Sequence, residues 1–193
     1  KNYTNLQNED PEIEFKNVVS SAFLPPYGPV YIELISAVAQ KIIDKRDFSL
    51  KIQKEINNLE YNDQIISLLE SSKKPVVVLG LENLIDNTSE VISKITNLLN
   101  CPTLVTYKAK GVISDNHENL VGIFTGGKAE QISIIQSDLI ILIGLDPVEL
   151  ILQPWPYDIP VLNISLVNHK VHYDNAEANL FGDLNFNLKK YLK

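Results

Sequence analysis

The stretch PVVVLGLENL, residues 75–84, decides the fold because it is an apolar strand pattern that ends at a glycine. A continuous apolar run followed by Gly80 is typical of a strand that is buried on both faces and leads into a ligand-binding turn. A dinucleotide-binding loop continues with further glycines, whereas Leu81 and Glu82 follow here. The stretch leaves three interpretations open: a cofactor site, a cofactor site that has been lost, and a simple strand end.

Similar apolar runs alternate with helical stripes along the rest of the chain. The spacing predicts helices over 63–72, 87–99, 129–136 and 184–192, and strands over 75–80, 102–107, 138–144 and 161–165. Asn87 and Glu90 have the spacing of a capping box at the start of the second helix. Helices between buried strands require crossover connections, so we expect an α/β fold with a doubly wound, mostly parallel, Rossmann-like sheet.

A smaller unit precedes this pattern. Residues 11–23 have helical spacing after a proline, and VYIELI at 30–35 alternates like a strand. Residues 44–61 are polar and charged, as in a linker that crosses a surface. We therefore expect a helix-strand appendage in 1–40, a linker in 41–61 and a central Rossmann-like domain in 62–193.

Composition excludes several classes of function. The net charge of −7 and the single arginine, Arg46, argue against a nucleic-acid partner, since nucleic-acid binders concentrate basic residues on one face. No apolar run is long enough for a membrane helix, and the first residues are polar and acidic, so we expect a cytoplasmic protein without a membrane partner. Cys101 is the only cysteine and is expected to be a small buried residue. The chain contains no methionine, so we expect it to be a fragment of a longer protein.

Three further features have a functional and a structural interpretation. Gly126 and Gly127 precede a helix and could hold a phosphate, but a tight turn is favoured. His169 and His172 have a spacing seen in metal sites, but a surface loop is favoured and we predict no metal site. Trp155 lies between two prolines and indicates either a contact with another domain or a lid over the sheet edge.

Taken in order, the segments resemble the middle part of a thiamine diphosphate-dependent enzyme of the acetolactate synthase type. The resemblance covers residues 11–193. The order and spacing of the matching segments are more specific than any single motif. The matching residues are Ala22, Phe23, Gly28, Pro29, Val30, Lys74, Pro75, Val76, Pro102, Thr106, Lys110, Gly111, Asp115, His117, Gly126, Gly127, Asp138, Leu139, Ile143, Gly144, Gly182 and Asp183.

The resemblance implies that this is the central domain of such an enzyme, with the last helix and strand of the preceding pyrimidine-binding domain. The parent would decarboxylate a 2-keto acid with thiamine diphosphate and Mg²⁺ and transfer the product to an acceptor. The family's catalytic glutamate and its GDG motif lie in the flanking domains, and Gly182-Asp183-Leu184 is not that motif. We therefore expect no catalytic residue in this chain, and we expect the flanking domains and further copies of the parent as partners.

Relatives of this type bind FAD in the central domain, or ADP, or nothing. FAD-binding relatives have glycines at the positions of Leu81 and Glu82. They also have an arginine shortly after the position of Gly144 and an acidic residue at the position of Ser165. Glu82 and Asp146 instead place negative charge near a would-be diphosphate, so we expect no cofactor in this domain, with FAD or ADP as the alternatives. An FAD-like or vestigial cleft would be lined by Gly80, Leu81, Tyr107, Lys108, Gly144, Leu145, Ser165 and Asp183. A freestanding nucleotide-binding module is the alternative to the central-domain assignment.

Overall fold

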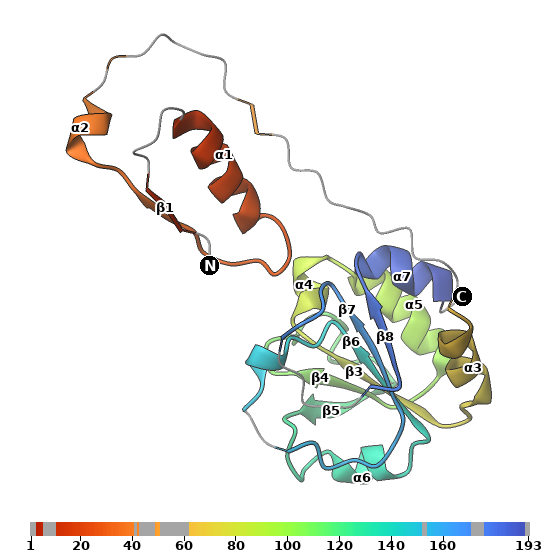
Figure 1. Ribbon diagram of the computed structural model, residues 1–193. Helices are drawn as coiled ribbons and strands as arrows, with labels where there is room; N and C mark the ends of the chain where they lie inside the picture. The colour runs from red at the N-terminus through yellow and green to blue at the C-terminus, as the bar shows by residue number, and fades with distance from the viewer. Residues whose placement is uncertain are drawn as a thin grey trace. The chain divides into compact units, whose positions relative to one another are not determined.

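The computed structural model describes residues 3–5, 11–40, 42, 49–50, 62–151, 154–170 and 176–191. The chain divides into two compact units, residues 1–55 and 56–193, called here the N-terminal unit and the central unit. Most of the predicted linker, residues 41–61, lies outside the described residues. Figure 1 shows both units.

The N-terminal unit is small, and none of its residues with a described side chain is buried. Helix α1 (Pro11–Ala22) accompanies a two-stranded parallel sheet of β1 (Tyr3–Asn5) and β2 (Tyr31–Glu33), followed by the short helix α2 (Ser36–Ala39). The predicted helix and strand are present, whereas β1 was not predicted. No residue of α1 is buried, so the helix does not form a closed core with the described residues around it.

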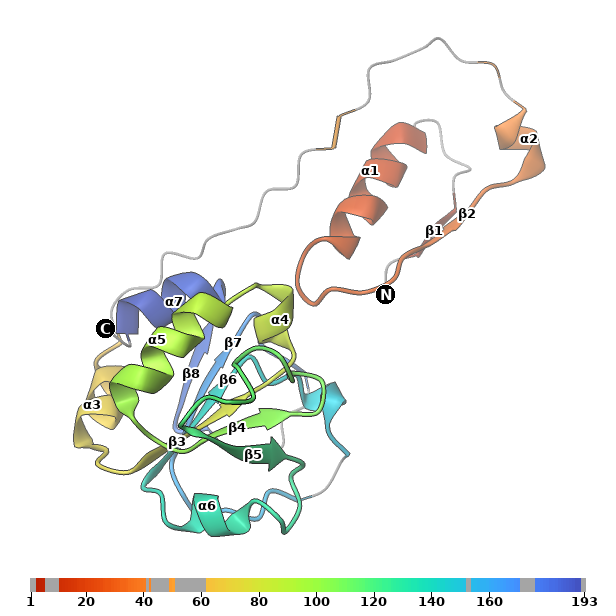
Figure 2. The ribbon, with the colours of Figure 1, turned by 180° about the vertical axis from the view of Figure 1, so that it is seen from behind.

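The central unit is built on a six-stranded, fully parallel sheet with the order β5-β4-β3-β6-β7-β8. This confirms the predicted Rossmann-like α/β fold. Figures 1 and 2 show α5 and α7 on one face of the sheet and α6 on the other. The strands are β3 (Pro75–Leu79), β4 (Thr103–Thr106), β5 (Leu120–Phe124), β6 (Leu139–Ile143), β7 (Val161–Ser165) and β8 (Ala178–Phe181).

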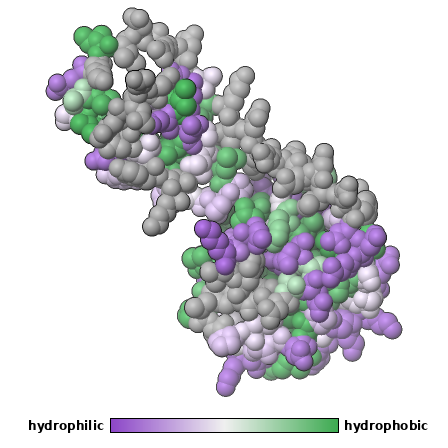
Figure 3. Space-filling view, viewed as in Figure 1, coloured by the Kyte–Doolittle hydropathy of each residue, from purple (hydrophilic) through white to green (hydrophobic). Residues whose placement is uncertain are grey.

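Five α-helices and one 3₁₀ helix are described in the central unit. They are α3 (Asp63–Ser71), α4 (Glu82–Ile85), α5 (Ser89–Leu99), α6 (Gln131–Ile135), η1 (Pro147–Glu149) and α7 (Leu184–Tyr191). Hydrophilic side chains cover most of the side of this unit that carries α3 (Figure 3). Every residue of β6 and β7 is buried, as expected for central strands of a sheet covered on both faces.

Some local predictions were wrong or incomplete. The sequence pattern missed β5, whose Gly122 interrupts the apolar run, and the short strand β8, which contains the polar Asn179. The predicted capping box is also wrong. Helix α5 begins at Ser89, Asn87 has a positive φ of 51°, and the Thr88 hydroxyl donates to the Asn83 side chain at 2.9 Å instead of capping the helix.

Candidate functional site

The topological switch point lies between β3 and β6. From these two adjacent strands the sheet continues through β4 and β5 on one side and through β7 and β8 on the other. In such sheets ligands bind beyond the carboxyl ends of the strands at this point, which places Gly80 and Gly144 at the expected crevice. The fold therefore brings together the two glycines that sequence reasoning selected.

The backbones after β3 and β6 are in direct contact at the switch point. The Gly80 amide donates to the Ile143 carbonyl at 2.9 Å, and the Glu82 amide donates to the Gly144 carbonyl at 3.0 Å. A methyl group added at Gly80 would collide with the Gly144 carbonyl oxygen and the Leu145 Cα. Gly80 is therefore required by the close approach of the chain's own backbone.

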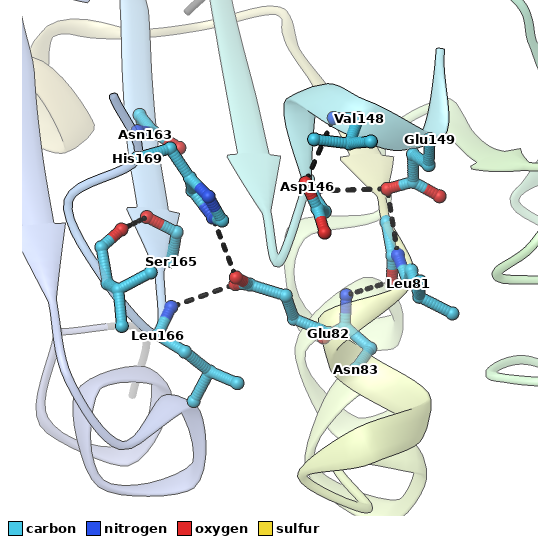
Figure 4. A network of polar contacts seen from close by, with 12 residues as sticks. Leu81, Glu82, Asn83, Asp146, Val148, Glu149, Asn163, Ser165, Leu166 and His169 are labelled. Carbon is cyan, nitrogen blue, oxygen red and sulfur yellow. Dashed lines mark hydrogen bonds and ion pairs between the residues drawn. The ribbon is translucent and has the colours of Figure 1, made fainter. Parts of the chain in front are cut away.

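A carboxylate from η1 lies at this point, and Figure 4 shows it pointing toward the end of β3. Glu149 Oε1 accepts hydrogen bonds from the amides of Leu81 at 2.9 Å and Asp146 at 3.1 Å. The Thr106 hydroxyl, at the end of β4, donates to Glu149 Oε2 at 2.5 Å. Burial raises the pKa of Glu149, whereas the hydrogen bonds from Thr106, Leu81 and Asp146 act in the opposite direction.

A second carboxylate joins β3 to the loop after β7. Glu82 Oε2 accepts from the Leu166 amide at 2.8 Å, and Glu82 Oε1 lies 2.8 Å from His169 Nε2 (Figure 4). The side chains of His169 and Glu82 are only 12% and 6% exposed. The hydrogen bond with Glu82 raises the pKa of His169 despite the opposing effect of burial. The pair therefore ties the end of β7 to the start of α4.

A third carboxylate fills the turn that contains the glycine pair. Glu130 Oε1 accepts from the amides of Thr125 at 2.9 Å and Gly127 at 2.8 Å. The Thr125 hydroxyl lies 3.1 Å from Glu130 Oε2. The amides that could hold a phosphate are thus used by a side chain of the same chain, which supports the interpretation of this segment as a turn.

The other predicted cleft residues are dispersed along the sheet. Tyr107 is 67% exposed after β4, Lys108 is exposed, and Leu145 is 4% exposed within the hydrophobic core. The Ser165 hydroxyl donates to the Val167 carbonyl at 2.9 Å. Asp183 accepts from the Phe186 amide at 2.8 Å and so caps α7. Their role in cofactor binding stays a prediction.

Other residues that the sequence singled out have structural contacts. Cys101 is buried, and burial raises the pKa of its thiol to about 11. His117 accepts from the Asn119 amide at 3.2 Å and so stabilises the turn before β5. Trp155 packs edge-to-face on Tyr157 with ring centroids 5.1 Å apart. His172 lies outside the described residues, and no cluster with metal-ligand composition occurs among the residues that are described.

These contacts test whether a dinucleotide fits the switch point. A diphosphate needs backbone amides that face an open space, with glycines that allow close approach. Here the Leu81 and Asp146 amides already donate to Glu149, and Gly80 lies against Gly144. Among the described residues, the amides of Leu81 and Asp146 and the backbone at Gly80 are therefore not open to a diphosphate.

Sequence reasoning selected the strand ends that meet at the switch point but did not select Glu149, which contacts them. Glu82 and Asp146 were expected near a diphosphate. Instead Glu82 bonds the β7 loop, and Asp146 Oδ1 accepts from the Val148 amide at the start of η1. The signal for Glu149 was present in DPVE, residues 146–149, since Asp followed three residues later by Glu is the pattern of a capping box.

Comparison with known proteins identifies the central unit. The sequence model of the family described as "Thiamine pyrophosphate enzyme, central domain" matches residues 62–190. The chain belongs to this family. A probable acetolactate synthase large subunit from Methanococcus aeolicus is 26% identical over 197 residues, which cover 95% of this chain and 33% of that protein. A probable pyruvate decarboxylase from Schizosaccharomyces pombe is 27% identical over 123 residues, or 61% of this chain and 21% of that protein.

Solved structures support the fold of this central domain. The crystal structure of benzoylformate decarboxylase from Polynucleobacter necessarius matches 99% of this chain and 38% of its own, with a TM-score of 0.76 and 19% identity. Both the acetolactate synthase and the benzoylformate decarboxylase match nearly all of this chain, but the chain spans only about a third of their length. Among the described residues, no helix has the length and apolar character needed to cross a membrane.

Proposed function

We propose that this chain is the central domain of a thiamine diphosphate-dependent 2-keto acid decarboxylase or carboligase and that its own role is structural. The contacts at the switch point support the second part of the proposal. Gly80 lies against Gly144, and the amides of Leu81 and Asp146 both donate to Glu149. A domain of this type spaces the cofactor-binding domains of the parent and binds no FAD or ADP itself.

The parent's reaction is proposed from its relatives. The matched proteins include a probable acetolactate synthase and a probable pyruvate decarboxylase. Thiamine diphosphate, when bound, supplies the carbanion stabilisation that decarboxylation of a 2-keto acid needs. No residue of this chain is assigned to that chemistry. Thiamine diphosphate and Mg²⁺ are assigned to flanking pyrimidine- and diphosphate-binding domains of the parent.

Contacts with those domains and with further copies of the parent are proposed from the surface of the central unit. Among the described residues of the central unit, large apolar side chains are exposed at several places, which include the carboxyl rim of the sheet and the β5–α6 edge. Patches of exposed apolar residues mark interaction sites in many soluble proteins. The exposed residues are Tyr107, Val148 and Ile151 at the rim and Val121, Ile132 and Ile135 at the edge. A cytoplasmic location and the domain limits 1–40, 41–61 and 62–193 stay predictions from the sequence.

The absence of a cofactor is tested on the purified chain. We expect a visible absorption spectrum without a flavin band, and no change in melting temperature when FAD or ADP is added. A flavin band near one equivalent, or a rise in melting temperature with either nucleotide, would overturn the cofactor-free role. The parent reading frame distinguishes the central domain from a freestanding module. It should extend by about 170 residues on each side of this chain if the chain is a central domain, and should not if the chain is a freestanding module.

A further inference from the structure

The donors around Glu149 form an arrangement that is normally used to bind an external anion. Two are backbone amides at the ends of adjacent parallel strands, from Leu81 after β3 and Asp146 after β6. The third is the Thr106 hydroxyl, at the end of the neighbouring strand β4. Amides and hydroxyls that converge on one point at a switch point are the chemistry that recognises a phosphate group.

Glu149 uses these donors completely. Its Oε1 accepts from both amides, and its Oε2 accepts from the Thr106 hydroxyl. Glu149 Oε1 is also only 2.6 Å from the position of a Cβ at Gly80, so the side chain fills the space beside that glycine. A phosphate could enter only by displacing the carboxylate or by approaching a second negative charge at contact distance.

Carboxylates accept from loop amides at two further places along the carboxyl ends of the strands. Glu82 accepts from the Leu166 amide after β7, and Glu130 accepts from the Thr125 and Gly127 amides after β5. Three carboxylates of the chain therefore bind backbone amides of four loops, those after β3, β5, β6 and β7. This repetition indicates a general role, in which internal anions replace the ligand that organises these loops in a nucleotide-binding sheet.

We propose that Glu149 is an internal anion that occupies a latent oxyanion-binding site, formed by the amides of Leu81 and Asp146 and the hydroxyl of Thr106. Glu149 is then the residue that determines that the domain takes no diphosphate. Its removal should open the site to a small oxyanion such as inorganic phosphate. This inference rests on the proposed cofactor-free role and names the residue responsible for it.

The experiment compares the full chain with three variants by thermal unfolding at increasing concentrations of inorganic phosphate, with sodium chloride at matched ionic strength as the reference. Glu149→Ser removes the carboxylate and leaves space. Glu149→Gln removes the charge but keeps the volume. Glu118→Ser is the matched control, because Glu118 is an exposed glutamate in a loop and its removal changes the net charge by the same amount.

We expect phosphate to raise the melting temperature of Glu149→Ser by roughly 2–4 °C at about five times its dissociation constant, beyond the effect of chloride. The original chain, Glu149→Gln and Glu118→Ser should respond to phosphate no more than to chloride. Equal responses of Glu149→Ser and Glu118→Ser would overturn the proposal. A phosphate response in the original chain at the same concentrations would also overturn it, since Glu149 would then not exclude the anion.

If Glu149→Ser does not fold in low salt, the proposal predicts that refolding at high phosphate recovers the cooperative transition, whereas matched chloride does not. Failure of phosphate to rescue folding would contradict it. This outcome is distinct from failure of the proposed function. Bound flavin or ADP in the original chain would refute the cofactor-free role, whereas an empty original chain with an unresponsive Glu149→Ser would refute only the role of Glu149.

Discussion

At the residue scale, the chemistry of the switch point is set by carboxylates that bind the chain's own donors. Glu149 joins the ends of β3, β4 and β6, and Glu82 joins the end of β3 to the loop after β7. Each carboxylate is placed where backbone amides would otherwise lack partners. Buried amides without partners are costly, so these side chains stabilise loops that have no ligand to order them.

The His169–Glu82 pair gives a pH dependence that can be tested. The pKa of His169 is raised in the folded state, chiefly by its hydrogen bond to Glu82. Because this pKa is raised, the pair of protonated His169 with Glu82 contributes stability that is fully present below the unfolded pKa of about 6.5. This stability is lost as pH rises through the pKa of the folded state. We expect His169→Gln to be less stable than the original chain by roughly 1.5–3 kcal/mol at pH below about 6, with a smaller difference at higher pH.

Urea unfolding of both chains at a series of pH values measures this difference. His117→Gln is the control, because His117 contacts Thr96 and Asn119 and forms no ion pair with a carboxylate among the described residues. A difference between His169→Gln and the original chain that stays constant or grows with rising pH would contradict the assignment of a charged pair.

At the scale of elements, the end of β8 and the start of α7 show how a predicted binding residue acts as a helix cap. Asp183 Oδ1 accepts from the Phe186 amide, and the Asp86 carboxylate accepts from the Leu184 amide at 3.1 Å. The first turn of α7 thus has carboxylate partners for two of its amides. Negative charge at this end also interacts favourably with the helix dipole.

Substitution of Asp183 separates capping from cofactor binding. We expect Asp183→Ala to lower the free energy of unfolding by about 1 kcal/mol, because the Phe186 amide loses its acceptor. Asp183→Ser, which retains a capping oxygen, should recover most of this loss. The measurement is urea unfolding followed by circular dichroism. Equal losses in both variants would show that the side chain does not act as a cap.

At the scale of the whole molecule, the hydrophobic core belongs to the central unit. The core cluster contains residues from β3, β4, β5, β6, β7 and α6, and its buried members fall between Val76 and Val161. The N-terminal unit contributes none of them. Independent folding is expected of a unit that holds its own core.

A chain of residues 56–193 tests this independence. We expect it to unfold in one cooperative transition whose midpoint in urea lies within error of the corresponding transition of the full chain. Residues 1–55 alone should show no cooperative transition, since α1 has no buried residue. A markedly lower midpoint for residues 56–193 would mean that the N-terminal unit stabilises the central core.

The sequence by itself determined the class of fold and the family. Apolar runs such as 75–80 and 138–144 must be buried on both faces, and that requirement, together with helical stripes between them, leaves few alternatives to a parallel sheet. Two strands lack this pattern and were missed, namely β5, which contains Gly122, and the short β8. They are strands because each pairs with a neighbouring strand, which their local composition does not indicate.

Only the tertiary structure decided what occupies the switch point. Gly80, Thr106 and Glu149 are far apart in the chain and meet because β3, β4 and β6 are neighbours in the sheet. Sequence reasoning placed a repelling charge near this point but assigned it to Glu82 and Asp146. Which carboxylate reaches which amide depends on where each loop turns after its strand, and that geometry is set by long-range packing rather than by local sequence.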